Sequence, residues 1–121
     1  MIRKCSDMTV DKNEHMRGGE GVVTVRHFSD KEEMLGKGRM FATMLLPPGA
    51  SIGKHQHVND FEVYVIQKGR AKVMDPDNGE AFLEPGDMML CRDSEFHAIE
   101  NAGEDVLEVT ALILYTTSPI D

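Results

Sequence analysis

The stretch Gly49–Gly69, GASIGKHQHVNDFEVYVIQKG, places two histidines and a glutamate among residues typical of buried strands. Side chains two residues apart on a strand point to the same side, so His55 and His57 should project together. The sequence VND, residues 58–60, is suited to a corner that leads into a second strand carrying Glu62. Two imidazoles on one strand therefore stand beside a carboxylate on the next.

Glu62 is expected on the buried face of that second strand. By the same alternation it shares its face with Tyr64 and Ile66. A carboxylate buried there requires a partner or a metal ion. Imidazole nitrogen and carboxylate oxygen suit Mn, Fe, Co, Ni, Cu or Zn when about three or four such groups converge. The alternative is an HxH pair on a solvated strand or loop, so support for a metal site depends on a further histidine.

Short apolar segments rich in Val, Ile, Thr, Phe and Tyr run along the whole chain, separated by turn sequences such as PPG, KGR, DPDNG and EPGD. This spacing predicts an all-β sandwich or barrel. The predicted strands span residues 21–28, 39–46, 61–67, 72–75, 81–84, 87–91 and 106–117. One helical turn is expected in SDKEEMLGKG, residues 29–38, with Ser29 as its N-cap.

The further histidine is His97, in EPGDMMLCRDSEFHAIEN, residues 84–101, and the two stretches together resemble the two motifs of the cupin superfamily. The first motif is matched at Gly49, His55, His57, Glu62 and Gly69. The second motif is matched at Gly86, His97 and Asn101, whereas Arg92 and Ser94 stand where a proline and a glycine are usual. These two departures bear on the conformation of the loop before His97 and leave the metal ligands in place.

The resemblance covers about residues 46–114 and implies a jelly-roll barrel of antiparallel strands in which the two motifs form neighbouring hairpins. It also implies one divalent transition metal ion per chain, whether Mn, Fe, Ni, Co or Zn, held by His55, His57, Glu62 and His97. In this interpretation residues 1–121 are a single domain, with residues 1–45 as leading strands and 46–114 as the barrel. The alternative role for His97 is a hydrogen bond within the core.

The amino-acid composition of the chain limits the kinds of partner that it can bind. A chain of 121 residues with 40% hydrophobic and 28% charged residues has the size and make-up of one globular domain. Its net charge of -8 and scattered Lys and Arg residues disfavour nucleic acid. No apolar run approaches the roughly 20 residues of a membrane span, and the N-terminus lacks a signal-peptide pattern. We therefore expect no membrane partner, a cytoplasmic location, and Cys5 and Cys91 as thiols.

Three further residues are candidates to bind a substrate. Tyr64 could donate a hydrogen bond to a ligand, although a core tyrosine with a satisfied hydroxyl is the alternative. Arg39 and Arg92 could clamp a carboxylate if they reach the barrel mouth; otherwise they are solvated arginines that flank strands. No general acid or base can be identified from the sequence.

The resemblance leaves several functions open, because cupins include dioxygenases, decarboxylases, isomerases and binding domains. We expect a metal-dependent enzyme, an oxidoreductase or a lyase, that acts on a small carboxylate or enediol. An oxalate-decarboxylase-like lyase and a quercetinase-like or thiol dioxygenase both fit. The alternatives are a non-catalytic binding or sensing module and, less favoured, a metal-free sugar-phosphate isomerase.

A homodimer is expected as well. Val63 and Val65 alternate with the Glu62 face, so their apolar face needs cover from another sheet of this chain or of a second copy.

Overall fold

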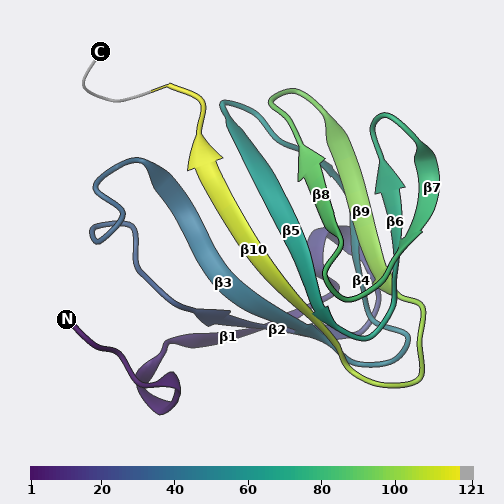
Figure 1. Cartoon of the computed structure of the whole chain (residues 1–121), viewed down its shortest axis with the longest axis horizontal. Coiled ribbons are helices and arrows are strands. Elements are labelled where there is room, and N and C mark those ends of the chain that lie inside the picture. Colours follow the sequence, from purple (N-terminus) through teal and green to yellow (C-terminus); the bar gives the residue numbers. More distant parts are fainter. Residues whose placement is uncertain (118–121) are drawn as a thin grey trace.

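The computed structural model describes residues 1–117, which form antiparallel strands and two short 3₁₀ helices (Figure 1). The helices are η1 (Cys5–Asp7) and η2 (Met16–Gly18). The strands are β1 (Val10–Glu14), β2 (Val22–His27), β3 (Gly38–Leu46), β4 (Ser51–Gln56), β5 (Asp60–Lys68), β6 (Ala71–Asp75), β7 (Gly79–Leu83), β8 (Met88–Cys91), β9 (Phe96–Asn101) and β10 (Leu107–Tyr115). The all-β prediction is confirmed.

The strands form two sheets. The larger has six strands in the order β1-β2-β3-β10-β5-β8, and the smaller has four in the order β4-β9-β6-β7. In Figure 1 β10 runs between β3 and β5, so the last described strand lies at the centre of the larger sheet. Within residues 1–117 no strand pairing joins the two sheets, so the jelly roll is an open sandwich and the strands do not close into one hydrogen-bonded barrel.

The expected pairing of each motif as a hairpin is wrong. Strand β4 pairs with β9 in the smaller sheet, while β5 pairs with β8 and β10 in the larger sheet. Each motif therefore crosses from one sheet to the other, because its two strands belong to opposite layers. This crossing brings His55 and His97 into direct register on one sheet and places Glu62 on the other.

Alternation along the strands creates the core between the sheets. On β5, Asp60, Glu62, Tyr64 and Ile66 are buried, and the residues between them are partly exposed. Strand β10 alternates in the same way along its length. The buried apolar residues include Val23, Val25, Met44, Leu46, Ile52, Tyr64, Ile66, Val73, Ile99, Leu107 and Val109. The sandwich thus has one continuous core, and the polar residues on β5 lie at its edge.

Residues 31–36 form turns, in which one hydrogen bond of helical type, from Met34 N to the carbonyl oxygen of Asp30 at 3.3 Å, is present, but no helix follows where a helical turn was expected. The cap is Asp30 instead of Ser29: Glu33 N donates to Asp30 Oδ1 at 2.8 Å, and Asp30 N donates to Glu33 Oε1 at 3.0 Å. This is a capping box, but the backbone turns left-handed at Leu35, where φ is 56°. The turn therefore does not continue into a helix.

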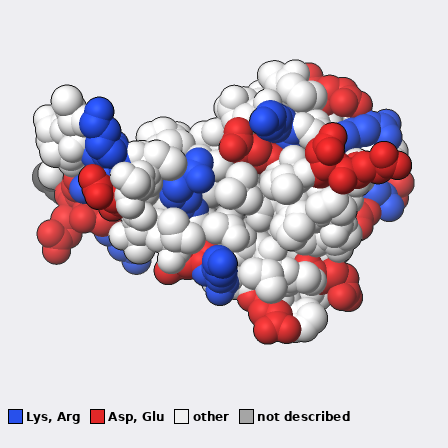
Figure 2. All heavy atoms as spheres, turned by 90° about the horizontal axis from the view of Figure 1, so that it is seen from below, with Lys and Arg blue, Asp and Glu red and all other residues white. Residues whose placement is uncertain are grey.

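No helix in the described part of the chain is long and apolar enough to cross a membrane. Figure 2 shows acidic and basic side chains interspersed on the face seen from below, where no continuous stripe of Lys and Arg is formed.

Candidate metal centre

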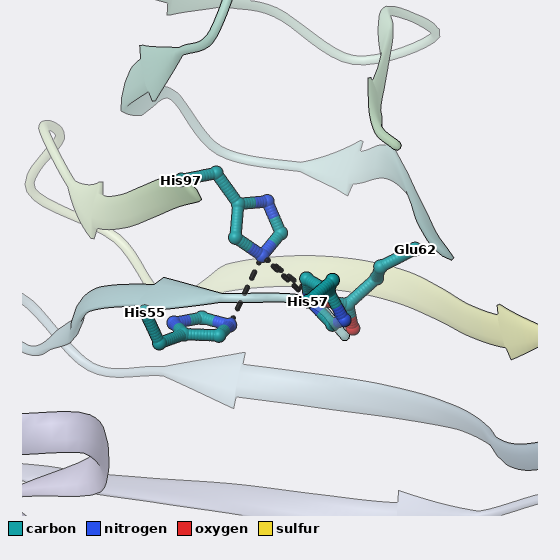
Figure 3. A group of neighbouring side chains, drawn as sticks. All are labelled: His55, His57, Glu62 and His97. Carbon is teal, nitrogen blue, oxygen red and sulfur yellow. Dashed lines mark hydrogen bonds and ion pairs between the residues drawn. The ribbon is translucent and has the colours of Figure 1, made fainter. Parts of the chain in front are cut away.

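Four side chains, which come from three strands and from the residue that follows one of them, point toward a common space (Figure 3). They come from β4 (His55), the residue after β4 (His57), β5 (Glu62) and β9 (His97). One ligand atom from each lies within 4.8 Å of the others. His57, Glu62 and His97 are buried and His55 is half-buried, so the group is closed on most sides.

The donor atoms approach one another closely. His97 Nε2 lies 3.1 Å from His57 Nε2 and 3.0 Å from His55 Nε2. Glu62 Oε1 lies 3.0 Å from His57 Nε2 and 3.1 Å from His97 Nε2. Nitrogen and oxygen ligands bind first-row ions at about 2.0–2.2 Å, so two that bind at right angles stand about 3.0 Å apart. The spacing therefore fits one shared ion, and these four residues could hold it.

Hydrogen bonds on the outer side of two imidazole rings fix which nitrogen would face a bound ion. His57 Nδ1 lies 2.7 Å from Asp60 Oδ1, and His55 Nδ1 lies 2.8 Å from the carbonyl oxygen of Gly53. Both acceptors require a protonated Nδ1, which leaves Nε2 of each neutral ring as a metal ligand. Asp60 is held in turn by Arg39, whose Nε donates to its Oδ2 at 2.7 Å.

The third imidazole is positioned by packing. The Tyr64 ring stacks on His97 with centroids 4.9 Å apart and an interplanar angle of 9°. His97 Nδ1 is buried and has no hydrogen-bond partner in the described part of the chain. Tyr64 thus orients the ring of His97 through a flat contact instead of a hydrogen bond.

The pKa values of the side chains in the cluster are shifted in different directions. Burial lowers the pKa of His57, but hydrogen bonds to Glu62 and Asp60 outweigh burial and leave that pKa raised. For Glu62, burial raises the pKa, but hydrogen bonds from His57 and His97 prevail and lower it to about 2. Burial lowers the pKa of His55 to about 4. At neutral pH Glu62 is therefore ionised and His55 is neutral, as metal ligands must be.

A cavity of about 50 Å³ opens beside the ligands. His55, His57, Glu62 and Tyr64 line one part, and its remaining walls are Met16, Arg17, Arg39, Met40, Met44, Ile52 and Ile113. Two of the three predicted substrate-binding residues, Tyr64 and Arg39, therefore reach this space. Burial raises the pKa of Tyr64 well above its usual value, and the nearby Glu62 carboxylate adds to this effect.

The structure does not bring Arg92 to the cavity. Its guanidinium is exposed and lies 3.1 Å from Asp77 and 3.4 Å from Glu95. Arg92 thus forms ion pairs with these two acidic residues on the surface.

Two residues of the site were missed by the sequence analysis. Asp60 was assigned to a corner, although extending the alternation of Glu62 and Tyr64 back by two residues would have placed it on the buried face. Arg17 lies in a segment without strand periodicity, and no sequence signal connects it with the two motifs.

The loop before His97, which carries the two departures from the motif, has a serine in the left-handed region that favours glycine. Ser94, at the position where glycine is usual, has a left-handed φ of 71°. Its N–H donates to the carbonyl oxygen of His57 at 2.7 Å, and its own carbonyl accepts from Gln56 Nε2 at 2.9 Å. Serine accepts the backbone that glycine would adopt, and the loop holds the end of β4 in place.

The motif asparagine has a structural role. Asn101 Nδ2 donates to the carbonyl oxygens of Leu46 and Asp105, both at 2.8 Å, and Asn101 Oδ1 accepts from Gly103 N at 2.8 Å. It ties the end of β9 to the end of β3 and the loop that follows β9.

Residues 42–114 match the family model described as a cupin domain. The chain belongs to the cupin family. An oxalate-binding protein from Thermotoga maritima is 40% identical over 115 residues, which are 94% of this chain and 93% of that protein. A crystal structure described as a predicted oxalate decarboxylase, also from Thermotoga maritima, superposes with a TM-score of 0.89 at 38% identity and covers 95% of this cupin and 99% of that chain.

The fold is also found in structures with little sequence identity to this chain. A polyketide cyclase from Streptomyces resistomycificus has a TM-score of 0.73 at 16% identity, covering 98% of this chain and 82% of its own. At that identity the likeness shows the fold alone. Together the comparisons confirm the predicted cupin family and jelly-roll fold.

Proposed function

We propose that this cupin binds a small dicarboxylate such as oxalate at a metal ion held by His55, His57, Glu62 and His97. The observation that carries the proposal is the position of the ligand cluster: three of its four residues, His55, His57 and Glu62, line a cavity of about 50 Å³ that two arginines also line. Arginine guanidinium groups match carboxylate geometry, and the metal ligands stand beside them. The names given to the Thermotoga maritima protein and to the Thermotoga maritima structure support oxalate as the first anion to test.

The size of the cavity limits the ligand. Sites for drug-sized molecules enclose about 300–1,000 Å³, far more than the space beside His55 and Glu62. A ligand with few non-hydrogen atoms fits the dimensions, whereas a flavonol does not. This supports small dicarboxylates over the quercetinase-like alternative.

The donor spacing bears on the kind of ion. Tetrahedral ligands at about 2.1 Å from an ion stand about 3.4 Å apart, whereas right-angle octahedral ligands stand about 3.0 Å apart. The separations of 3.0–3.1 Å around His97 support an octahedral ion such as Mn, Fe, Co or Ni over tetrahedral zinc. Such an ion supplies positive charge and Lewis acidity to an anionic ligand.

The residues around the cavity favour binding over proton-transfer catalysis. Apart from the metal ligands, its described lining offers only Tyr64, Arg17 and Arg39 as titratable groups. Because the pKa of Tyr64 is raised and arginine stays protonated, none of them is suited to exchange a proton near neutral pH. Binding without turnover is thus the simpler function of this site.

Catalysis remains the second candidate. It is favoured by the right-angle donor spacing, since an octahedral ion with four protein ligands keeps two positions for substrate or oxygen. An oxidoreductase or lyase of the expected kind would use those positions. Its proton donor would have to be solvent or substrate.

Calorimetric titration tests the proposal. Manganese- and iron-loaded protein is titrated with oxalate, formate, catechol and a flavonol, and the His97→Ala variant serves as the control with an impaired metal site. We expect saturable oxalate binding to the loaded wild type and none to the variant. Equal oxalate binding by both proteins would contradict the proposal. Formate production or oxygen uptake in the same samples would identify turnover.

We further infer that residues 1–121 act as one domain. This is supported by the pairing of β2 with β3 and of β3 with β10, which joins the leading strands to the sheet that carries Glu62. The cytoplasmic location and the homodimer stay predictions from the sequence.

A further inference from the structure

Two arginines reach the cavity, but only one of them forms an ion pair. Arg39 Nε donates to Asp60 Oδ2 at 2.7 Å, and the other oxygen of Asp60 accepts from His57. Arg39 therefore acts mainly on the metal-ligand cluster through Asp60. Arg17 is different: it is exposed, and within residues 1–117 it forms neither an ion pair nor a side-chain hydrogen bond, although it is one of the residues that line the cavity. Its five N–H donors remain available to a ligand.

The backbone at Arg17 is held in an unusual conformation. Its φ of 55° and ψ of 30° lie in the left-handed region, and His15 has a φ of 52° in the same segment. A non-glycine residue there is strained, and the strain persists where the surroundings enforce it. The segment around η2 is thus set by its contacts and not by local preference.

Those contacts are with β4, the strand that carries His55. A Cβ atom on Gly53 would stand 2.2 Å from the carbonyl oxygen of Arg17, and one on Gly19 would stand 2.2 Å from the carbonyl oxygen of Ser51. Only glycine allows the two backbones to approach this closely. Hydrogen bonds between Glu20 and Ser51, both 2.9 Å long, hold the end of the segment.

Gly53 connects this contact with the metal site. Its carbonyl oxygen accepts the Nδ1 hydrogen of His55 at 2.8 Å, while its Cα lies against the backbone of Arg17. The residue that orients one metal ligand therefore also fixes the position of the free arginine. Arg17 is placed relative to the metal site through a single glycine.

The charges around the cavity favour a ligand with two negative charges. Glu62 offsets one of the two charges of a divalent ion, and Asp60 offsets Arg39. Arg17 adds a positive charge that no residue within 1–117 balances by an ion pair. Its charge is also felt inside the site: burial raises the pKa of Tyr64 most, and Arg17 acts in the opposite direction. A monoanion would leave this excess charge only partly compensated.

We propose that Arg17 is the specificity-determining residue of this site. Arg17 binds one carboxylate of a dianionic ligand, and the metal centre binds the rest of that ligand. The inference rests on the proposed function and deepens it, because it explains why a dicarboxylate would be preferred to a monocarboxylate. Arg17 contacts the ligand and is not a metal ligand.

Substitutions that respect the left-handed backbone test this role. Arg17→Asn removes the charge with a residue that tolerates positive φ, and Arg17→Lys keeps the charge but loses the planar fork. Arg70→Gln is the matched control, because Arg70 is exposed and pairs with Glu84 away from the cavity. Each manganese-loaded protein is titrated calorimetrically with oxalate and with acetate, and its manganese content is measured.

We expect Arg17→Asn to weaken oxalate binding by about 10- to 100-fold and acetate binding by less than about 3-fold, because a charge-assisted pair to one carboxylate is lost. Arg17→Lys should recover part of the loss, and Arg70→Gln and the manganese content should not change. Wild-type oxalate affinity in Arg17→Asn, an equal loss for acetate, or loss of manganese would each overturn the assignment of Arg17. A loaded wild type that binds no oxalate would overturn the proposed function and this inference with it.

Discussion

Asp60 links the metal-ligand cluster to Arg39 and is itself almost fully buried. Its two carboxylate oxygens accept from His57 Nδ1 and Arg39 Nε, both at 2.7 Å. Hydrogen bonds of this kind orient a ligating imidazole and increase its basicity. Asp60, the last residue of the corner, therefore supports the candidate metal site, although it is not one of the four candidate ligands.

Replacing Asp60 should weaken metal binding without removing a ligand. We expect Asp60→Asn to lower the affinity for Mn²⁺ by about 10- to 100-fold, because the charge that supports His57 is lost. A competition titration with a chelator measures the effect, and Asp77→Asn, at an exposed aspartate, is the control. Unchanged affinity in Asp60→Asn would show that Asp60 is only a structural partner of Arg39.

Proton competition should be spread over a wide pH range. The raised pKa of His57 means that protons compete with the ion above pH 6.5, whereas His55, with a pKa of about 4, competes only in stronger acid. Affinity for Mn²⁺ should fall as the pH is lowered from 7 to 5, with fewer than three protons taken up per ion released. A slope of three protons across this range would contradict the unequal protonation of the cluster.

The clustering of the four candidate ligands could be predicted because fixed spacing in the two motifs identifies these residues without knowledge of strand pairing. Asp60 was missed because a turn sequence next to it favoured a corner, although the alternation on β5 begins at that residue. Arg17 could not be predicted. Its place at the cavity depends on a backbone contact with Gly53, which lies far from it in sequence.

The loop between β8 and β9 determines how the second motif meets the first. Ser94 occupies a left-handed conformation there and holds the carbonyl oxygen of His57, so the loop and the end of β4 are fixed together. The sequence indicated a departure from the motif at this position but could not show whether the conformation changed.

Ser94→Gly should stabilise the chain. Relief of about 1–2 kcal/mol of left-handed strain outweighs a loss of about 0.4–1 kcal/mol from the greater freedom of glycine in the unfolded state, for a net gain of about 0.5–1 kcal/mol. Urea denaturation of the metal-free protein measures the change. Ser29→Gly is the control, since Ser29 has no positive φ and should lose stability. Equal losses in both variants would refute the strain at Ser94.

Strands β1 and β9 were not among the predicted strands, and weak alternation explains only β1. Strand β1, VDKNE, is exposed along most of its length and pairs only with β2 at the edge of the larger sheet. Strand β9 alternates clearly, but it was considered only as part of the second motif. The crossing of each motif between sheets was missed for another reason: local spacing identifies strands, whereas their partners are set by the packing of the whole sandwich.

The outer face of the larger sheet is apolar across four strands. Phe41, Leu112, Val63 and Leu90 stand in register from β3 through β10 and β5 to β8. Met88, beside this row, is 53% exposed. An apolar face of this extent is typical of an interface.

We therefore keep the prediction of a homodimer that covers this face. Light scattering at micromolar concentration should give twice the chain mass of 13.5 kDa, and Val63→Lys should shift the protein toward the monomer. A mass of 13.5 kDa for the wild type would exclude the dimer under those conditions.

The central claim, that four residues from the two facing sheets hold one ion, is tested most directly by the metal content per chain. Mass spectrometry after manganese loading and gel filtration should give close to one ion per wild-type chain. The double variant His57→Ala, His97→Ala should retain almost none, because two of the four ligands are lost from a buried cluster. Stoichiometric manganese in the double variant, with its fold intact by circular dichroism, would contradict the account.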